Sequence, residues 1–308
     1  MYSVRVWMAM AESSDRNRAK PIDNLGTVDK YRAEKKLVCT LTALRSESST
    51  FNDSFIMQAP NPLVMLVNEM KARTPRKRQI TLLGKTFWQF PTVFDSEFTQ
   101  QGCEFLASEV SQIVKEELSN MDNEDFFDFL EVGCGNGNTL IEVALNHDNC
   151  RIWATDINPN AIENTKENVQ LHGLENRVYA FTGDVYNVPD LKDRRFDLIF
   201  WSFPFIPFAS PNPQEKRVLS PLERGLVDPE YKGLREFLEG ARDHLKKTGR
   251  ILFAFSFKIG SEDLLKKVMA ETGWGFRVLS EAEVELKFTL YPMSMKNDVQ
   301  LLEALCLE

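Results

Sequence analysis

The sequence predicts an α/β fold in which a mainly parallel sheet carries helices on both faces. From Phe126 onward, short apolar runs alternate with amphipathic segments of helical length, an order that builds a right-handed parallel sheet. The first run, residues 126–132, leads directly into Gly133, Gly135 and Gly137. A strand that enters such a turn before a helix presents backbone N–H groups to a nucleotide-like ligand, although glycines also serve purely steric turns. The last two runs follow each other without a helix, which predicts an antiparallel pair.

The composition is that of an ordinary globular protein. Of 308 residues, 43% are hydrophobic and 27% are charged. The formal net charge of −8 argues against a broadly basic nucleic-acid-binding surface. The five cysteines are scattered without a C-x-x-C pair and the three histidines lack metal-ligand spacing, so we expect reduced thiols, a cytoplasmic location and no metal. No apolar run reaches about 18 residues, so we expect no membrane span.

The chain divides into an N-terminal extension, residues 1–78, and a domain, residues 79–308. The extension is expected to be partly helical, with an amphipathic helix over residues 62–73. Its last eight residues, 71–78, carry five positive charges, which fits a solvated loop or a contact for phosphate or an acidic partner. Two strand-like runs around Gly84 and Lys85 predict a β-hairpin.

Within the domain, a helix is predicted over residues 104–118, because its apolar residues fall on one face. The strands are expected at residues 126–132, 151–156, 178–182, 196–201, 250–255, 276–288 and 299–307. The helices between them are expected at residues 138–147, 159–172, 232–245 and 262–272. Pro159 suits the first turn of its helix, and Gly173 suits the stop.

Acidic residues follow the second and third strands at the edge where parallel sheets bind ligands. The carboxylate of Asp156 offers two acceptor oxygens for the two hydroxyls of a ribose, or it caps the helix that begins at Pro159. Asp184 ends the third strand, where it either contacts a ligand or serves as a loop residue.

The residues Glu131–Gly137 read E-x-G-x-G-x-G. This pattern resembles motif I of the class I S-adenosylmethionine-dependent methyltransferases, whereas a nicotinamide-binding fingerprint would require glycine in place of Asn138. The final antiparallel pair is also similar to the seven-stranded, Rossmann-like sheet of these enzymes. The resemblance implies that S-adenosyl-L-methionine is the cofactor. It implies that the cofactor-binding residues are Glu131, Gly133, Gly135, Gly137, Asp156, Ile157, Asp184 and Val185.

The fourth strand ends in a turn of unusual composition. Residues 197–207 read DLIFWSFPFIP and resemble the D-x-x-x-x-N-P-P-Y-I-P segment of the HemK-like glutamine methyltransferases. In that family the Asn side chain and a proline carbonyl accept hydrogen bonds from the target nitrogen, and the aromatic ring packs on its planar group. The corresponding residues here are Ser202, Phe203, Pro204 and Phe205. The resemblance implies transfer to nitrogen, while the loss of the Asn amide argues against a glutamine acceptor.

Further candidates for substrate contact lie on either side of this turn. Residues 90–102 resemble the segment that lies over the cofactor in methyltransferases of the small-domain type. The pocket-lining candidates from this segment are Phe94, Phe98 and Gln101, and the alternative for its aromatic residues is a place in the core. The long loop of residues 206–231 is rich in Pro, and loops of this length are often functional. The candidates from the loop are Phe208, Asn212, Glu223 and Arg224.

These patterns favour an S-adenosylmethionine-dependent methyltransferase that N-methylates a small molecule or a protein side chain. An RNA or DNA base methyltransferase is the second enzyme interpretation, in which residues 71–78 would contact the polynucleotide. A non-catalytic partner that keeps the cofactor-binding fold is the third. A dehydrogenase is disfavoured by the glycine spacing and by the final antiparallel pair.

Overall fold

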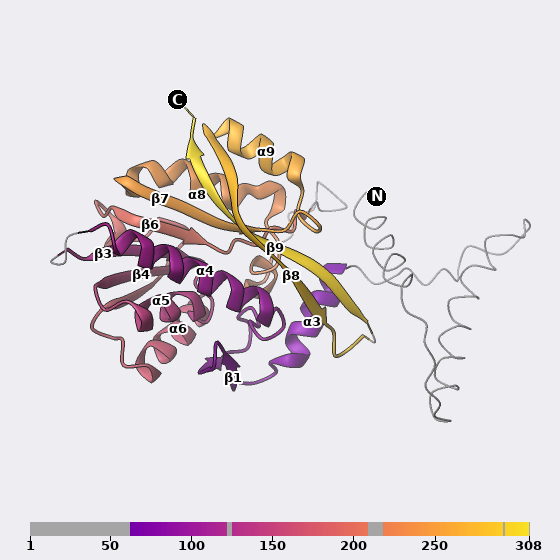
Figure 1. Ribbon diagram of the computed structural model, residues 1–308. Coiled ribbons are helices and arrows are strands. Elements are labelled where there is room, and N and C mark those ends of the chain that lie inside the picture. Colours follow the sequence, from indigo (N-terminus) through magenta and orange to yellow (C-terminus); the bar gives the residue numbers. More distant parts are fainter. Residues whose placement is uncertain (1–61, 122–124, 209–217, 292, 308) are drawn as a thin grey trace, which may run out of the picture. The chain divides into compact units, whose positions relative to one another are not determined.

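A seven-stranded sheet flanked by helices forms the centre of the described part of the chain (Figure 1). The computed structural model describes residues 62–121, 125–208, 218–291 and 293–307. The strand order is β5-β4-β3-β6-β7-β9-β8. The strands are β3 (Phe127–Val132), β4 (Cys150–Asp156), β5 (Val178–Thr182), β6 (Phe196–Trp201), β7 (Leu245–Phe255), β8 (Trp274–Lys287) and β9 (Ser294–Cys306).

The pairing confirms the predicted fold class. Strands β3 to β7 pair in parallel, whereas β9 runs antiparallel to both β7 and β8. Every residue of the central strand β3 is buried, as expected for a strand covered on both faces. The order reverses at β3, which has β4 on one side and β6 on the other. Ligands of open parallel sheets bind at such a switch point, outside the carboxyl ends of the strands.

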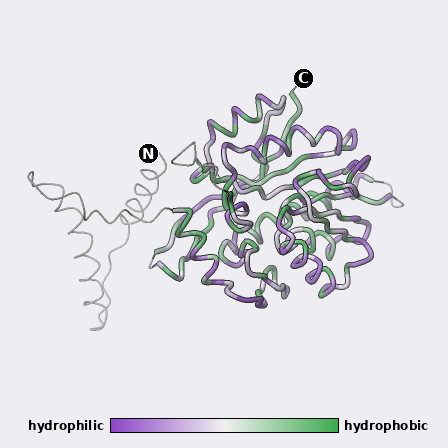
Figure 2. Tube along the Cα trace, turned by 180° about the vertical axis from the view of Figure 1, so that it is seen from behind, coloured by the Kyte–Doolittle hydropathy of each residue, from purple (hydrophilic) through white to green (hydrophobic). Residues whose placement is uncertain are grey.

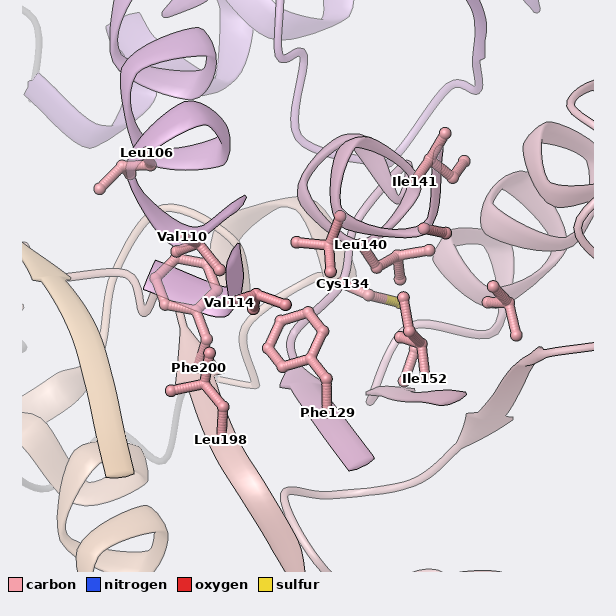
Figure 3. Close-up of a cluster of buried hydrophobic side chains, with 14 of the residues drawn as sticks. Leu106, Val110, Val114, Phe129, Cys134, Leu140, Ile141, Ile152, Leu198 and Phe200 are labelled. Atoms are coloured by element: carbon pink, nitrogen blue, oxygen red, sulfur yellow. The ribbon is translucent and has the colours of Figure 1, made fainter. Parts of the chain in front are cut away.

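Helices cover both faces of this sheet. They are α4 (Gln100–Leu118), α5 (Asn138–Asn146), α6 (Pro159–Leu171), α8 (Lys232–His244) and α9 (Glu262–Glu271). Buried residues of α4, α5 and α6 form one apolar cluster with the sheet, and those of α8 and α9 form another. Figure 3 shows the first cluster, in which Val110 and Val114 of α4 approach Phe129 and Phe200. Figure 2 shows that hydrophobic and hydrophilic residues alternate along the Cα trace of the described residues.

The C-terminal hairpin extends farther than its apolar runs predicted. Strand β9 begins at Ser294 instead of residue 299, and β8 pairs with it along its length. The added residues alternate between exposed and buried along the start of β9. Because half of them face solvent and are polar, a search for continuous apolar runs does not detect them. Strand β7 likewise begins at Leu245, five residues before the expected start at Arg250.

A short helix and a small hairpin precede the sheet. Helix α3 (Pro62–Arg73) contacts the turn between β8 and β9, where the buried Glu69 carboxylate accepts hydrogen bonds from the backbone N–H groups of Thr289 at 2.7 Å and Leu290 at 2.9 Å. Strands β1 (Arg78–Leu82) and β2 (Lys85–Gln89) form the expected hairpin. The division of the chain after residue 78 stays a prediction.

Two features are absent from the described residues. No helix among residues 62–307, where placed, is long and apolar enough to cross a membrane. The same residues contain no group of three or more His, Cys, Asp and Glu side chains arranged to hold a metal ion.

Candidate cofactor and acceptor site

The turn between β3 and α5 is built from glycines in the left-handed region. Gly133, Gly135 and Gly137 have φ angles of +63°, +58° and +82°, values that side chains other than glycine adopt only with strain. A Cβ on Gly135 would meet no atom within 4 Å. The turn therefore leaves open space above its middle glycine, and a ligand can come close to the backbone there.

Glu131 supports this turn from within the protein. Its side chain is 4% exposed, and its Oε2 accepts a hydrogen bond at 3.0 Å from the backbone N–H of Leu140 in the first turn of α5. Burial raises the pKa of this carboxyl group to about 8, and the nearby Asp156 contributes to the rise. Glu131 thus connects the end of β3 to the start of α5 behind the glycines.

Asp156 lies at the carboxyl end of β4 and faces the turn. Its Oδ2 accepts from the Gly135 N–H at 3.0 Å and its Oδ1 from the Asn158 N–H at 2.8 Å. Burial raises its pKa, which these two hydrogen bonds oppose. The helix cap is Asn158, whose side chain accepts from the Asn160 N–H at 3.1 Å. Asp156 is therefore not the cap, and each of its oxygens keeps a lone pair for a ligand hydroxyl.

The residues after β4 and β5 border the same edge of the sheet. Ile157 is 38% exposed. Asp184 is also exposed and begins a tight turn, in which its backbone carbonyl accepts a hydrogen bond from the Asn187 N–H at 2.8 Å. Val185 is buried with a φ of +49°, and its carbonyl accepts from Thr155 Oγ1 at 3.0 Å. An apolar side chain, a carboxylate and an ordered backbone thus adjoin Asp156, a donor and acceptor set that fits an adenosine.

The turn after β6 separates into an exposed and a buried part. Ser202 is exposed, whereas Phe203 is 1% exposed and packs among aromatic rings. Its neighbours are Trp201, Phe205, Tyr231, Phe253 and Phe255. Pro204 and Phe205 are partly exposed. The side chain of Phe203 therefore anchors the turn in the core, and only its backbone is left to face an acceptor.

Tyr231 holds this turn in place and was not predicted from the sequence. Its buried hydroxyl donates to the Phe205 carbonyl at 2.6 Å and accepts from the Ser261 N–H at 2.7 Å, so it joins the turn to the start of α9. Tyr231 and Glu230 both have left-handed φ angles, +52° and +55°. Nothing in the local sequence distinguishes this tyrosine, because its role depends on contacts 26 and 30 residues away.

The predicted substrate residues occupy different environments. Phe94 lies beside Gly225, where a Cβ would be 3.7 Å from the Phe94 Cβ. Glu223 forms a capping box with Ser220 at the start of the short helix α7 (Pro221–Arg224), and Arg224 is exposed. Phe208 is partly buried after the β6 turn. Asn212 lies outside the described residues.

Two candidates of the segment before α4 are directed elsewhere. Phe98 is buried, and its ring contacts Phe288 of the C-terminal hairpin edge-on at 5.2 Å. Gln101 Oε1 accepts from the Glu285 N–H at 2.9 Å. The side chains of Phe98 and Gln101 thus contact the C-terminal hairpin, and their place in the lining of a pocket stays a prediction.

A network of amide side chains ties β2 to the glycine turn, and this network was also missed. Gln89 Oε1 accepts from Asn136 Nδ2 at 3.1 Å, and Asn168 Nδ2 donates to the Asn136 carbonyl at 2.8 Å. Asn164 and Asn168 of α6 also bind the backbone of Trp88. The available signal was the i, i+4 spacing of these two asparagines, which places both on one helix face.

Residues 129–228 match the family model described as a methyltransferase domain. This match supports a class I methyltransferase domain in this part of the chain. S-Adenosyl-L-methionine is the cofactor of this class, and the glycine turn and Asp156 lie within the matched residues. The seven-stranded order with an antiparallel last pair agrees with the assignment.

Curated relatives of the methyltransferase domain act on different acceptors. The release factor glutamine methyltransferase of Aquifex aeolicus is 32% identical over 143 residues, which are 44% of this chain and 50% of the relative. The ribosomal RNA small subunit methyltransferase C of Haemophilus influenzae (strain 86-028NP) is 26% identical over 205 residues, 64% of this chain and 55% of the relative. The chain thus spans about half the length of the curated relatives it matches.

Among solved structures, the domain is similar to magnesium protoporphyrin IX methyltransferase from Synechocystis PCC 6803 with bound S-adenosylhomocysteine. The sequence identity is 13% and the TM-score is 0.45, with 70% of this chain and 88% of that chain covered.

Proposed function

We propose that the chain is an S-adenosylmethionine-dependent methyltransferase that methylates a nitrogen of a small molecule or of a protein side chain. The observation that carries the proposal is the bond between Asp156 and the Gly135 N–H, at 3.0 Å, which joins the ends of β4 and β3 at the switch point. The methyltransferase match supports the reaction class. The exposed Ser202 at the end of the adjacent β6 supports transfer to a molecule bound there.

The cofactor would be held by the ends of three neighbouring strands. Asp156 would accept the ribose hydroxyls, while Ile157 and Val185 would border the adenine and Asp184 would accept from its amine. When bound, S-adenosylmethionine supplies a methyl group activated by a sulfonium. Glu131 would act through the turn, because its Oε2 accepts a hydrogen bond from the Leu140 N–H at 3.0 Å.

The acceptor would be positioned by the turn Ser202–Phe205. The hydroxyl of Ser202 both accepts and donates a hydrogen bond, so it can orient a nitrogen so that its lone pair faces the methyl group. Phe205 would contact the flat face of the acceptor, and its carbonyl is held by Tyr231 at 2.6 Å. The anchored Phe203 would keep this turn fixed. Positioning and exclusion of water are the main demands of such a transfer.

A polynucleotide acceptor is less well supported, although one relative is a ribosomal RNA methyltransferase. Three of the five basic side chains of residues 71–78 have structural partners. Arg73 pairs with Glu69, Lys77 with Glu167, and Arg78 with Asp95 and Glu97. These pairs neutralise much of the segment. RNA affinity that falls steeply with salt would favour this alternative.

The remaining parts of the proposal concern organisation. Residues 1–78 would be an extension of the domain formed by residues 79–308. A cytoplasmic location is supported by the thiols of Cys103, Cys134, Cys150 and Cys306, all of them free.

The test is transfer of labelled methyl from S-adenosylmethionine into fractions of a cell extract. We expect label in the small-molecule or protein fraction, because the acceptor turn is exposed. Ser202→Ala should abolish most of the transfer while S-adenosylhomocysteine still binds. Exposed Ser119→Ala, at the end of α4, is the matched control and should leave transfer unchanged. Binding without any transfer would indicate a non-catalytic protein, and label in RNA would indicate the nucleic-acid alternative.

A further inference from the structure

Trp201 lies beside the first glycine of the cofactor turn. It is the last residue of β6 and is the register partner of Val132, the residue that precedes Gly133. A Cβ placed on Gly133 would overlap the indole Nε1 and would lie 3.0 Å from Cδ1. The indole N–H edge therefore contacts the backbone of the glycine turn itself.

The far side of the same ring is fixed by the fold. A Cβ on Gly233, near the start of α8, would lie 3.0 Å from the Cη2 atom of Trp201. The ring also contacts Phe237 at 5.3 Å and Phe203 at 5.8 Å between centroids. Because both ends of the indole meet glycines and the ring packs against two tilted aromatic rings, the nitrogen has a defined position.

The indole nitrogen donates no hydrogen bond to any group in the described part of the chain. Trp201 Nε1 is not among the fully buried side-chain atoms of the described residues that lack a hydrogen-bond partner. Because it has no partner and is not fully buried, the nitrogen is accessible to solvent, and Trp201 as a whole is only partly buried. An indole N–H can only donate, so a ligand that displaces its water must provide an acceptor.

We propose that Trp201 is a cofactor-binding residue whose indole N–H donates a hydrogen bond to the carboxylate of the amino-acid end of S-adenosylmethionine. This inference rests on the cofactor site proposed above. There, Asp156 takes the ribose on the β4 side of the glycine turn, which leaves the β6 side, where Trp201 lies, for the opposite end of the molecule. The ammonium group at that end is a donor, so the carboxylate is the acceptor that the indole requires.

The experiment compares two ligands by calorimetry on the full chain. S-Adenosylhomocysteine has the amino-acid end, and 5′-methylthioadenosine lacks it. Trp201→Phe removes the N–H and should weaken S-adenosylhomocysteine by about tenfold or more, the usual effect of a hydrogen bond to a charged group, while methylthioadenosine binds as before. Trp153→Phe, on β4 among Tyr179 and Phe196, is the matched control and should change neither affinity.

Unchanged binding of methylthioadenosine also shows that the variant is folded. A second measurement uses fluorescence, because S-adenosylhomocysteine should shift the tryptophan emission of the unaltered chain and not that of Trp201→Phe. Equal affinity of Trp201→Phe and the unaltered chain for S-adenosylhomocysteine would overturn the inference, and so would an equal loss for both ligands. Failure of the unaltered chain to bind either ligand would overturn the cofactor site as well.

Discussion

Replacing Asp156 tests the cofactor site at its centre. In the free chain its carboxylate accepts from two backbone N–H groups, those of Gly135 at 3.0 Å and Asn158 at 2.8 Å. In the complex it would also accept two ribose hydroxyls. A hydrogen bond to a charged group contributes roughly 1.5–3 kcal/mol, so loss of two such bonds should weaken binding by at least about 100-fold.

The assay is calorimetric titration with S-adenosylhomocysteine, and two variants separate binding from structure. Asp156→Ala removes both acceptor oxygens and should also lower the melting temperature, because the Gly135 N–H loses its partner. Asp156→Asn keeps one acceptor oxygen, so it should retain more of the stability but still bind weakly. Exposed Asp243→Ala on α8 is the control. An affinity of Asp156→Ala within a few-fold of the unaltered chain would refute the reasoning.

Two further predictions concern stability. Burial raises the pKa of Glu131 from 4.5 to about 8. Between these two pH values the folded chain holds a proton that the unfolded chain has lost. The free energy of unfolding should therefore fall as the pH rises from 4.5 to about 8, by up to about 1.4 kcal/mol per pH unit. Urea titrations of Glu131→Gln should lack this fall, and an identical pH profile would contradict the assignment. Tyr231→Phe leaves the Phe205 carbonyl and the Ser261 N–H without their hydrogen-bond partner. It should lower the free energy of unfolding by about 1–3 kcal/mol, measured from the midpoint of urea unfolding. A midpoint equal to that of the unaltered chain would show that water replaces the hydroxyl.

The sheet was predictable because its signals are local. The apolar runs and the glycine turn identify β3 and its neighbours, and a carboxylate at the end of each of the next two strands falls at the ligand-binding edge by topology alone. The antiparallel pairing of the last two strands followed from the missing helix between them. These features need no knowledge of which side chains touch.

The parts that escaped prediction depend on contacts between distant segments. Gln89 meets Asn136 across 47 residues, and Tyr231 meets Phe205 across 26. Phe98 was assigned to the pocket because it lies in an aromatic segment, but its ring packs against Phe288 of the C-terminal hairpin. Sequence spacing cannot say which of several aromatic residues a remote strand will cover.

The central claim is that the cofactor lies across the carboxyl ends of β4, β3 and β6, with the acceptor turn beside its methyl group. An experimental structure of the chain with S-adenosylhomocysteine tests this most directly. We predict the ribose hydroxyls within hydrogen-bonding distance of Asp156, the adenine between Ile157 and Val185, and the sulfur facing the turn that begins at Ser202. A ligand bound away from the glycine turn, or one whose sulfur faces away from Ser202, would contradict the account.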